Sequence, residues 1–268
     1  MNLIFLGTAG GRFATIYQPR STGGIYIRAS ANVHVDPGPS AVWRMAQYNL
    51  DPSKTDAILI SHCHPDHYSD AEVLIEGMTE GTTKKRGTLI GSESVLKGNN
   101  GIGPAISNYH QGSVKEVCVA KPGDEFQLNS LKVYATFAKH TDPTTVGFKF
   151  ETEFGTLSYI SDTDITQRMI DSHKGSRLLI IATTRPLYSK IPFHLSTEDA
   201  AMVISQIKPE MAILTHFGLK TIKEGPNLQA DWVTKKSGVM TVAAEDGMKV
   251  QFAKGINVQG GGNKKKDG

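Results

Sequence analysis

The pattern of hydrophobic and polar positions is dominated by short apolar runs that are separated by turn-forming residues. Runs of this length, often alternating with polar residues and bounded by Gly, Pro, Asn or Asp, are typical of β-strands. The expected strands cover residues 2–6, 24–28, 32–35, 56–60, 88–90, 116–120, 131–138, 145–151, 156–161 and 178–182. The chain is therefore predicted to be rich in strands along most of its length.

Helix signals occur between and after these strands. We expect one helix over residues 40–48, with Trp43 in the core, and a second over residues 71–78. The clearest helix covers residues 196–207, because it has a capping serine, an acidic first turn and a proline shortly after its end. Strands with helices between and outside them predict an α/β protein with two sheets face to face and helices on both outer faces.

Length and composition fit one large domain. At 268 residues the chain can bury a substantial core, and 39% hydrophobic and 21% charged residues are ordinary for a globular protein. We expect one domain over residues 1–259 and a disordered, glycine- and lysine-rich tail over residues 260–268. No apolar run approaches the ~20 residues that cross a bilayer, and the first residues lack a signal-peptide pattern. We therefore expect a cytoplasmic protein without membrane contact.

Cysteine content and charge narrow the function classes further. Cys63 and Cys118 are too few for a disulfide framework, which agrees with a reducing compartment. The net charge of +3 is mildly basic and permits an anionic substrate. The strongly clustered basic face of a dedicated nucleic-acid-binding protein is not evident.

Candidate chemistry is concentrated in the stretch Ser-His-Cys-His-Pro-Asp-His at residues 61–67, directly after the apolar run 56–60. Imidazole and carboxylate groups are the ligands that suit Zn²⁺ and neighbouring divalent metals. Without a cation, three histidines and an aspartate in six residues would crowd desolvated or repelling groups together. The stretch therefore predicts a metal site. Cys63 should point away from its neighbours in an extended segment, and we interpret it as a buried structural thiol.

The pattern His-x-His-x-Asp-His at residues 62–67 resembles the signature of the metallo-β-lactamase-fold hydrolases. That resemblance implies a four-layer αββα sandwich with two metals between its sheets. The family's remaining ligands are single residues far along the chain, and this sequence offers one at each expected place, after an apolar, strand-like run. The implied ligands are His62, His64, Asp66, His67, His140, Asp162 and His216.

The resemblance also implies how these ligands are shared. One metal would be held by His62, His64 and His140, the other by Asp66, His67 and His216, with Asp162 bridging the two. The expected cofactors are two divalent ions, Zn²⁺ by preference, with Mn²⁺ or Fe²⁺ as alternatives. Two such ions share a water, lower its pKa toward ~7 and leave a metal-bridging hydroxide as nucleophile for hydrolysis. Asp36 resembles the family's aspartate that supports the site without binding metal.

Residues 5–8 (Phe-Leu-Gly-Thr) and 20–22 (Arg-Ser-Thr) resemble the opening of the ribonuclease Z branch of the family. Only Arg20 is kept from that branch's Pro-x-Lys-x-Arg-Asn loop, so we retain Arg20 as a candidate substrate-binding residue. The branch's long tRNA-gripping arm has no counterpart here. His194 resembles the branch histidine that stabilises the pentavalent phosphate and assists the leaving group. The candidate catalytic residues are therefore His194 and Asp66, and the substrate would be RNA or a small phosphodiester. Relatives of this branch are commonly homodimers.

Two other functions remain open. A thioester or lactone hydrolase of the glyoxalase II type uses the same ligands, whereas a metal-stabilised binding protein would have lost catalysis. Aspartate at position 162, where class B β-lactamases use cysteine, argues against antibiotic hydrolysis. Histidine at position 64, where diiron oxidoreductases generally have glutamate, argues against that chemistry.

Several neighbouring residues are assigned to ordinary roles. Residues 7–11 are rich in glycine and are expected to form a sharp turn near the site without a following helix, since a phosphate-loop pattern is absent. His34 is interpreted as a surface or packing residue and His173 as a surface residue at a helix end. Asp142 and Asp164 flank two of the ligands, and either orient imidazoles or lie in solvated loops.

Overall fold

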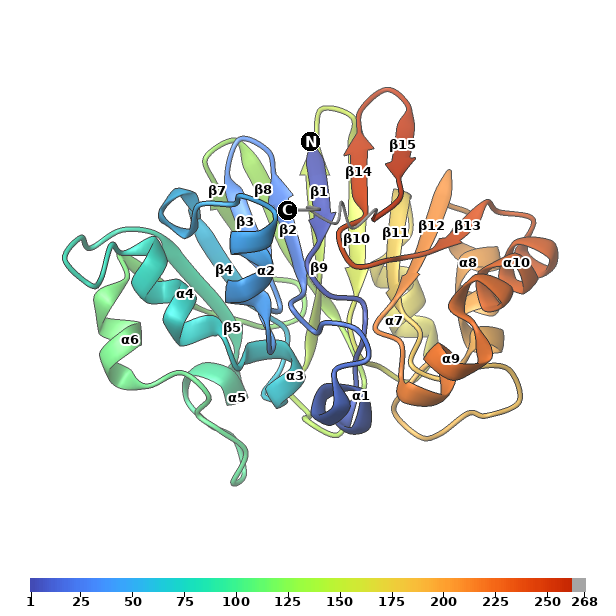
Figure 1. The fold of residues 1–268 in the computed structure, drawn as a ribbon, viewed down its shortest axis with the longest axis horizontal. Helices are drawn as coiled ribbons and strands as arrows, with labels where there is room; N and C mark the ends of the chain where they lie inside the picture. The colour runs from blue at the N-terminus through green and yellow to red at the C-terminus, as the bar shows by residue number, and fades with distance from the viewer. Residues whose placement is uncertain (262–268) are drawn as a thin grey trace, which may run out of the picture.

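Two β-sheets pack face to face in the computed structural model, which describes residues 1–261 (Figure 1). The strands of the first sheet are, in spatial order, β15 (Ile256–Gln259), β14 (Lys249–Phe252), β1 (Asn2–Phe5), β2 (Ile25–Arg28), β3 (Asn32–Val35), β4 (Ala57–Ile60), β5 (Thr88–Ser92) and β6 (Glu116–Ala120). Those of the second sheet are β13 (Thr241–Ala243), β12 (Met211–Thr215), β11 (Ser176–Ala182), β10 (Gly155–Ile160), β9 (Val146–Thr152), β8 (Leu131–Phe137) and β7 (Glu125–Leu128).

Helices cover the outer faces of the two sheets and one edge of the sandwich. They are α1 (Arg12–Tyr17), α2 (Ala41–Gln47), α3 (Pro65–Tyr68), α4 (Ala71–Met78), α5 (Glu93–Leu96), α6 (Asn108–Ser113), α7 (Gln167–Ser172), α8 (Thr197–Ile207), α9 (Leu219–Glu224) and α10 (Pro226–Ser237), with a 3₁₀ turn η1 at Pro52–Lys54. Figure 1 shows α2 to α6 on one side of the strands and α7 to α10 on the other. The protein is thus the four-layer αββα sandwich expected from the sequence. Among the described residues, no helix is both long and apolar enough to cross a membrane.

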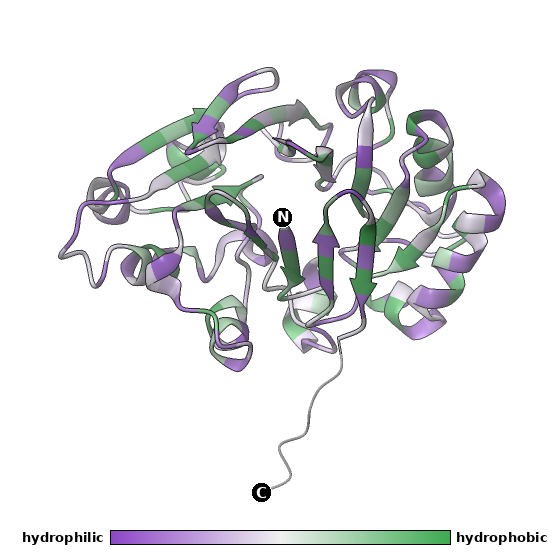
Figure 2. Cartoon of the chain, turned by 90° about the horizontal axis from the view of Figure 1, so that it is seen from above, coloured by the Kyte–Doolittle hydropathy of each residue, from purple (hydrophilic) through white to green (hydrophobic). Residues whose placement is uncertain are grey.

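Apolar side chains from alternate strand positions fill the space between the sheets, and the strands carry many of the hydrophobic positions seen in Figure 2. Val33 of β3 and Phe148 of β9 are fully buried in this central core. Met45 of α2 and Ile75 of α4 belong to a second core outside the first sheet, and Ile204 of α8 belongs to a third outside the second sheet. Each layer is therefore attached to the next by its own apolar contact.

Both sheets contain a run of parallel strands. Strands β3 to β6 pair in parallel in the first sheet, and β10 to β13 do so in the second. Parallel strands deliver their carboxyl ends to the same edge of a sheet, which is where open α/β sheets bind ligands.

The expected strands and the three expected helices are confirmed, with strand ends that shift by one or two residues. Three local expectations were wrong. A short helix, α1, does follow the glycine-rich turn. Trp43 is 56% exposed, because α2 turns Ala41 and Met45 toward the sheet. His173 is buried and not on the surface, because the end of α7 lays its ring against Gly147 of β9. Most of the expected tail, from residue 262 onward, lies outside the described residues.

Two helix starts are stabilised by carboxylates. Ser196 caps α8 as expected, and it forms a capping box with Asp199 of the first turn. Asp70 precedes α4, yet its carboxylate accepts a hydrogen bond from the backbone N–H of Val42, 3.0 Å away in the first turn of α2. Asp70 therefore stabilises a neighbouring helix in place of its own.

His173 should make stability depend on pH. Burial, and then the charge of Lys149, lower the pKa of His173 to about 3, and neither ring nitrogen has a hydrogen-bond partner among the described residues. An unfolded histidine titrates near 6.5, so between these pH values the unfolded chain binds a proton that the native chain does not. The free energy of unfolding should therefore fall as pH drops through this window, by at most about 1.4 kcal/mol per pH unit from this residue. In urea unfolding from pH 7 to 4.5, His173→Leu should show a shallower fall than wild type, and equal slopes would contradict the assignment.

Candidate metal centre

The segments that follow five strands meet at one edge of the sandwich, in the region of α1 and α3 (Figure 1). Strand β3 leads to Asp36, β4 to residues 61–67, β8 to His140, β10 to Asp162 and β12 to His216. The ligands implied by the sequence are thereby brought into two groups of converging side chains.

The first group consists of His62, His64 and His140. The Nδ1 atom of His64 lies 2.9 Å from Nε2 of His62 and 3.2 Å from Nε2 of His140. His62 and His140 are buried and His64 is half-buried, so this group has one side closer to solvent.

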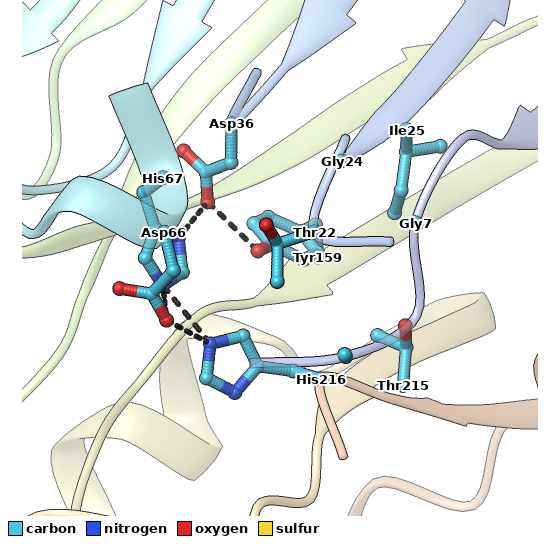
Figure 3. A pocket seen from close by; sticks show the side chains of 11 residues that line it. Gly7, Thr22, Gly24, Ile25, Asp36, Asp66, His67, Tyr159, Thr215 and His216 are labelled. Carbon is cyan, nitrogen blue, oxygen red and sulfur yellow. Dashed lines mark hydrogen bonds and ion pairs between the residues drawn. The ribbon is translucent and has the colours of Figure 1, made fainter. Parts of the chain in front are cut away.

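The second group consists of Asp66, His67, Asp162 and His216. Nε2 of His67 lies 3.0 Å from Nε2 of His216, and Oδ2 of Asp66 lies 3.3 Å from that His216 atom (Figure 3). Asp162 lies between the groups. Its Oδ2 is 3.6 Å from Nε2 of His67, 4.0 Å from Nε2 of His62 and 3.9 Å from Nε2 of His140.

These spacings fit metal ions. Ligand atoms held tetrahedrally at about 2.0–2.1 Å from one ion lie roughly 3.3 Å apart, and the nitrogen and oxygen pairs above fall close to that separation. Oδ1 of Asp162 is buried and lies 3.1 Å from Nδ1 of His216, without a hydrogen bond of regular geometry among the described residues. Lone pairs that converge in a dry site need a shared cation, so the donor set fits divalent metal binding.

The second ring nitrogens of His140 and His216 are held by further contacts. Nδ1 of His140 donates to the carbonyl of Phe193 at 2.9 Å, and Nδ1 of His216 is hydrogen-bonded to Oγ1 of Thr184 at 3.0 Å and lies 3.1 Å from Oδ1 of Asp162. Such contacts choose the tautomer and fix the ring, leaving the other nitrogen as the ligand atom. Phe193 and Thr184 both belong to the segment between β11 and α8. From the sequence, only His194 connected this segment to the site.

Asp36 is the buried hub behind the second group, and Figure 3 shows its carboxylate between His67 and Tyr159. Its Oδ2 accepts hydrogen bonds from Nδ1 of His67 at 2.9 Å, Oγ of Ser61 at 2.8 Å and the hydroxyl of Tyr159 at 2.8 Å. Its Oδ1 accepts from the backbone N–H of Ser61 at 2.7 Å. Asp36 thus supports a candidate ligand without itself belonging to either group.

Tyr159 and Ser161 are site residues that the sequence analysis missed. They lie two positions apart at the end of β10, so both face the first sheet. Tyr159 donates to Asp36, and Oγ of Ser161 donates to Oγ of Ser61 at 2.8 Å. Two polar residues on the inward face of an otherwise apolar strand were the signal that could have found them.

The glycine-rich turn approaches the centre closely. A Cβ on Gly10 would lie 2.1 Å from the His216 ring, so this position leaves no room for a side chain. The backbone N–H of Gly11 donates to Oδ2 of Asp66 at 2.7 Å, and α1 begins immediately afterwards. The expected sharp turn near the site is therefore present, in contact with two candidate ligands.

His194 also faces the centre. Its Nε2 lies 3.7 Å from Oδ2 of Asp162, its Nδ1 is hydrogen-bonded to the carbonyl of Pro192, and its side chain is 20% exposed. His140, Asp162 and His194 form a third group of converging atoms. His194 is therefore accessible to a substrate at the centre.

The remaining candidates make other contacts. The Arg20 guanidinium donates to the carbonyl of Ala244, and its substrate role stays a prediction. Asp142 accepts from the backbone N–H of Cys63 and so holds the backbone between two ligands without touching an imidazole. Asp164 pairs with Lys190 at 3.2 Å.

Burial and charge divide the histidines into two classes. Burial lowers the pKa of His62, His64 and His140, and for His140 the value is about 4. These imidazoles are neutral and available as ligands. Burial also acts against a charged His67, but the carboxylates of Asp66 and Asp36 raise its pKa well above the usual range. Burial acts to raise the pKa values of Asp66 and Asp162, but nearby histidines hold both below the usual range, so both carboxylates are ionised.

Comparisons with known proteins agree with this architecture. A family model described as "Beta-lactamase superfamily domain" matches residues 31–217. The chain is 40% identical over 258 residues to the uncharacterized protein MJ1374 of Methanocaldococcus jannaschii, covering 95% of this chain and 96% of that protein. It is 29% identical over 152 residues to Ribonuclease Z of Methanopyrus kandleri, covering 55% of this chain and 49% of that protein.

A solved structure shares the fold. The metallo-β-lactamase fold protein YhfI of Bacillus subtilis superposes with a TM-score of 0.77 at 16% identity, covering 92% of this chain and 98% of that chain. The sandwich, the converging histidines and aspartates at its edge and the family match over most of the chain lead to one conclusion. The chain belongs to the beta-lactamase superfamily and has the metallo-β-lactamase fold.

Proposed function

We propose that the chain is a binuclear, zinc-dependent hydrolase that cleaves phosphodiesters. The observation that carries the binuclear part is the position of Asp162, whose Oδ2 lies within 4.0 Å of ligand atoms of both groups. A carboxylate in that position can draw two cations together and offset part of their repulsion. Two divalent ions held there would activate water as a nucleophile and neutralise charge that develops on the ester oxygens.

The chain's own residues would then position and polarise the substrate. His194 is not one of the seven ligand candidates. Its ring nitrogen nevertheless approaches Asp162, from the side that is accessible to solvent. Because its Nδ1 is hydrogen-bonded to the carbonyl of Pro192, its Nε2 is aimed at the centre. From there a protonated His194 can donate to a phosphate oxygen or to the leaving oxygen.

The phosphodiester preference is supported by the similarity to a protein named Ribonuclease Z and by the place of His194 ahead of α8. RNA is the first natural phosphodiester to test. A homodimer and a cytoplasmic location stay predictions.

Removing the His194 imidazole should impair catalysis without removing metal. The zinc-loaded wild type should hydrolyse bis(p-nitrophenyl) phosphate faster than a thioester or a lactone. His194→Ala should lose about 10²–10⁴-fold in turnover, because charge stabilisation and proton donation are lost while every ligand candidate remains. Metal content is measured in the same samples. His110→Ala is the matched control, since His110 is a half-buried histidine that pairs with Glu72 and Glu76 away from the centre. Preferential thioester or lactone cleavage with a near-neutral His194→Ala would assign the chain to the glyoxalase II type instead.

Asp162→Asn should separate binuclear from mononuclear binding. The amide keeps the size of the side chain but removes the charge that serves both groups, so zinc content should fall from two ions to one or fewer per chain. Elemental analysis by mass spectrometry measures this ratio. Asp164→Asn is the control, because that neighbouring carboxylate pairs with Lys190. Two retained ions in Asp162→Asn would count against the bridging role.

Tyr159→Phe tests the hydrogen bonds to Asp36, the carboxylate that holds His67. Losing one hydroxyl leaves a buried carboxylate short of a donor, at a cost of about 1–3 kcal/mol in the free energy of unfolding. Because Asp36 orients His67, zinc affinity measured by chelator competition should also fall, by about 10- to 100-fold. The control is Tyr134→Phe, whose hydroxyl bonds Glu151 on the opposite face of the second sheet. Unchanged zinc affinity in Tyr159→Phe would reduce Tyr159 to a purely structural residue.

A further inference from the structure

A second polar recess lies on the outer face of the second sheet, away from the metal centre. It is a groove of about 610 Å³ between α7, the outward side chains of β8, β9 and β10, and the loop before β7. We call it the outer-face groove. Its lining residues are Pro122, Gly123, Tyr134, Ala135, Thr136, Phe137, Lys149, Glu151, Thr156, Arg168 and Ser172. None of them is a candidate metal ligand or contacts one through a hydrogen bond given above.

Two cations in this groove lack an anionic partner. Neither Lys149 nor Arg168 forms an ion pair with any carboxylate of the described residues. The ammonium group of Lys149 has a long contact to the carbonyl of Ser172, at 3.4 Å, and lies over the ring of Tyr134, 5.9 Å from its centroid. The guanidinium of Arg168 stacks on the ring of Phe137, 4.2 Å from its centroid, which leaves its N–H groups free to donate.

Buried polar groups lie beside these cations. Thr136 lines the groove, but its Oγ1 is buried against Gly147 and has no hydrogen-bond partner among the described residues. Thr136 stands opposite Gly147 in the sheet, and the unpartnered ring of His173 lies against that glycine. Because this hydroxyl is buried, Lys149 and Arg168 are the groups that the groove offers to an anion.

The groove also has polar side chains that can accept hydrogen bonds. The carboxylate of Glu151 accepts a hydrogen bond from the hydroxyl of Tyr134 at 2.9 Å, and Thr156 faces Glu151 in the neighbouring strand. This carboxylate and the Thr156 hydroxyl suit the hydroxyl groups of a ligand. The volume lies within the usual range of small-molecule sites.

We propose that the outer-face groove is a binding site for a phosphorylated sugar, including the sugar-phosphate part of a nucleotide. The phosphate would bind between Lys149 and Arg168, because these are the side chains that recognise phosphate. The sugar hydroxyls would point toward Glu151 and Thr156. This proposal does not rest on the proposed hydrolase activity, since the groove and the metal centre share no residue.

The test is a titration of the zinc-loaded protein with ribose 5-phosphate, followed residue by residue in amide NMR spectra. The amides of Thr136, Lys149 and Ser172 should shift in a saturable way. Inorganic phosphate should bind the same amides more weakly, because it lacks the hydroxyl contacts, and ribose should not bind them. Reading each amide separately distinguishes the groove from any phosphate that binds at the metal centre.

A substitution then tests the phosphate contact of Lys149. Lys149→Met should weaken ribose 5-phosphate binding at the groove about tenfold or more, because a charge-assisted hydrogen bond is lost. Lys132→Met is the matched control, since Lys132 lies on the same face of β8 but pairs with Glu125 and does not line the groove. Turnover at the metal centre should be the same in both variants.

Three results would overturn the proposal. Shifts confined to the metal centre would show that the groove does not bind phosphate. Equal weakening by Lys132→Met and Lys149→Met would show only a general charge effect. Equal affinity for inorganic phosphate and ribose 5-phosphate would rule out the assigned ligand class.

Discussion

The carboxylate of Asp36 is the contact on which the candidate centre depends. Four hydrogen bonds reach it, two from Ser61 at the end of β4, one from His67 in α3 and one from Tyr159 in the opposite sheet. A buried carboxylate tolerates loss of water only when its lone pairs are filled in this way. Because its donors come from both sheets, the face-to-face register of the sandwich is coupled directly to the orientation of a ligand candidate. A shift between the sheets would therefore break the hydrogen bonds to Asp36 and rotate the His67 ring at the same time.

The convergence of the candidate ligands could be predicted from the sequence because it depends on local order. A run of strand residues followed at once by histidine and aspartate places those side chains at a sheet edge, whatever the remaining topology. The outer partners of the same side chains were not readable. Phe193 contributes a backbone carbonyl to His140, which carries no residue signature, and Tyr159 meets Asp36 only through the register between two sheets. Sequence pattern specifies which face a strand residue uses, but not which residue of another sheet lies opposite.

The expectations for Trp43 and His173 were wrong for a related reason. In a helix as short as α2 the apolar positions do not decide which way the helix turns, and Asp70 contributes by fixing the first turn from another segment. His173 looked like a polar helix end, whereas the end of α7 packs its ring against Gly147 in the neighbouring sheet. Positive φ angles mark three site residues, Asp36 at 51°, His216 at 59° and Phe193 at 64°. Backbone of this kind costs energy and persists where surrounding contacts impose it, so it follows from the assembled site and not from local preference.

One strand illustrates how the fold keeps its two polar regions apart. Inward residues of β8 such as Val133 belong to the core between the sheets, whereas Thr136 faces the outer-face groove. Three residues after β8 ends, His140 joins the first ligand group. Because successive side chains of a strand point to opposite faces, β8 contributes to the apolar core on one face and to the polar groove on the other. The segment after its end reaches the candidate metal centre. Because a close-packed sheet separates the groove from the core, a small side-chain change in the groove has no hydrogen-bonded route to the ligands. Effects of substitutions in the two regions should consequently add, which is the behaviour of sites that share no partner.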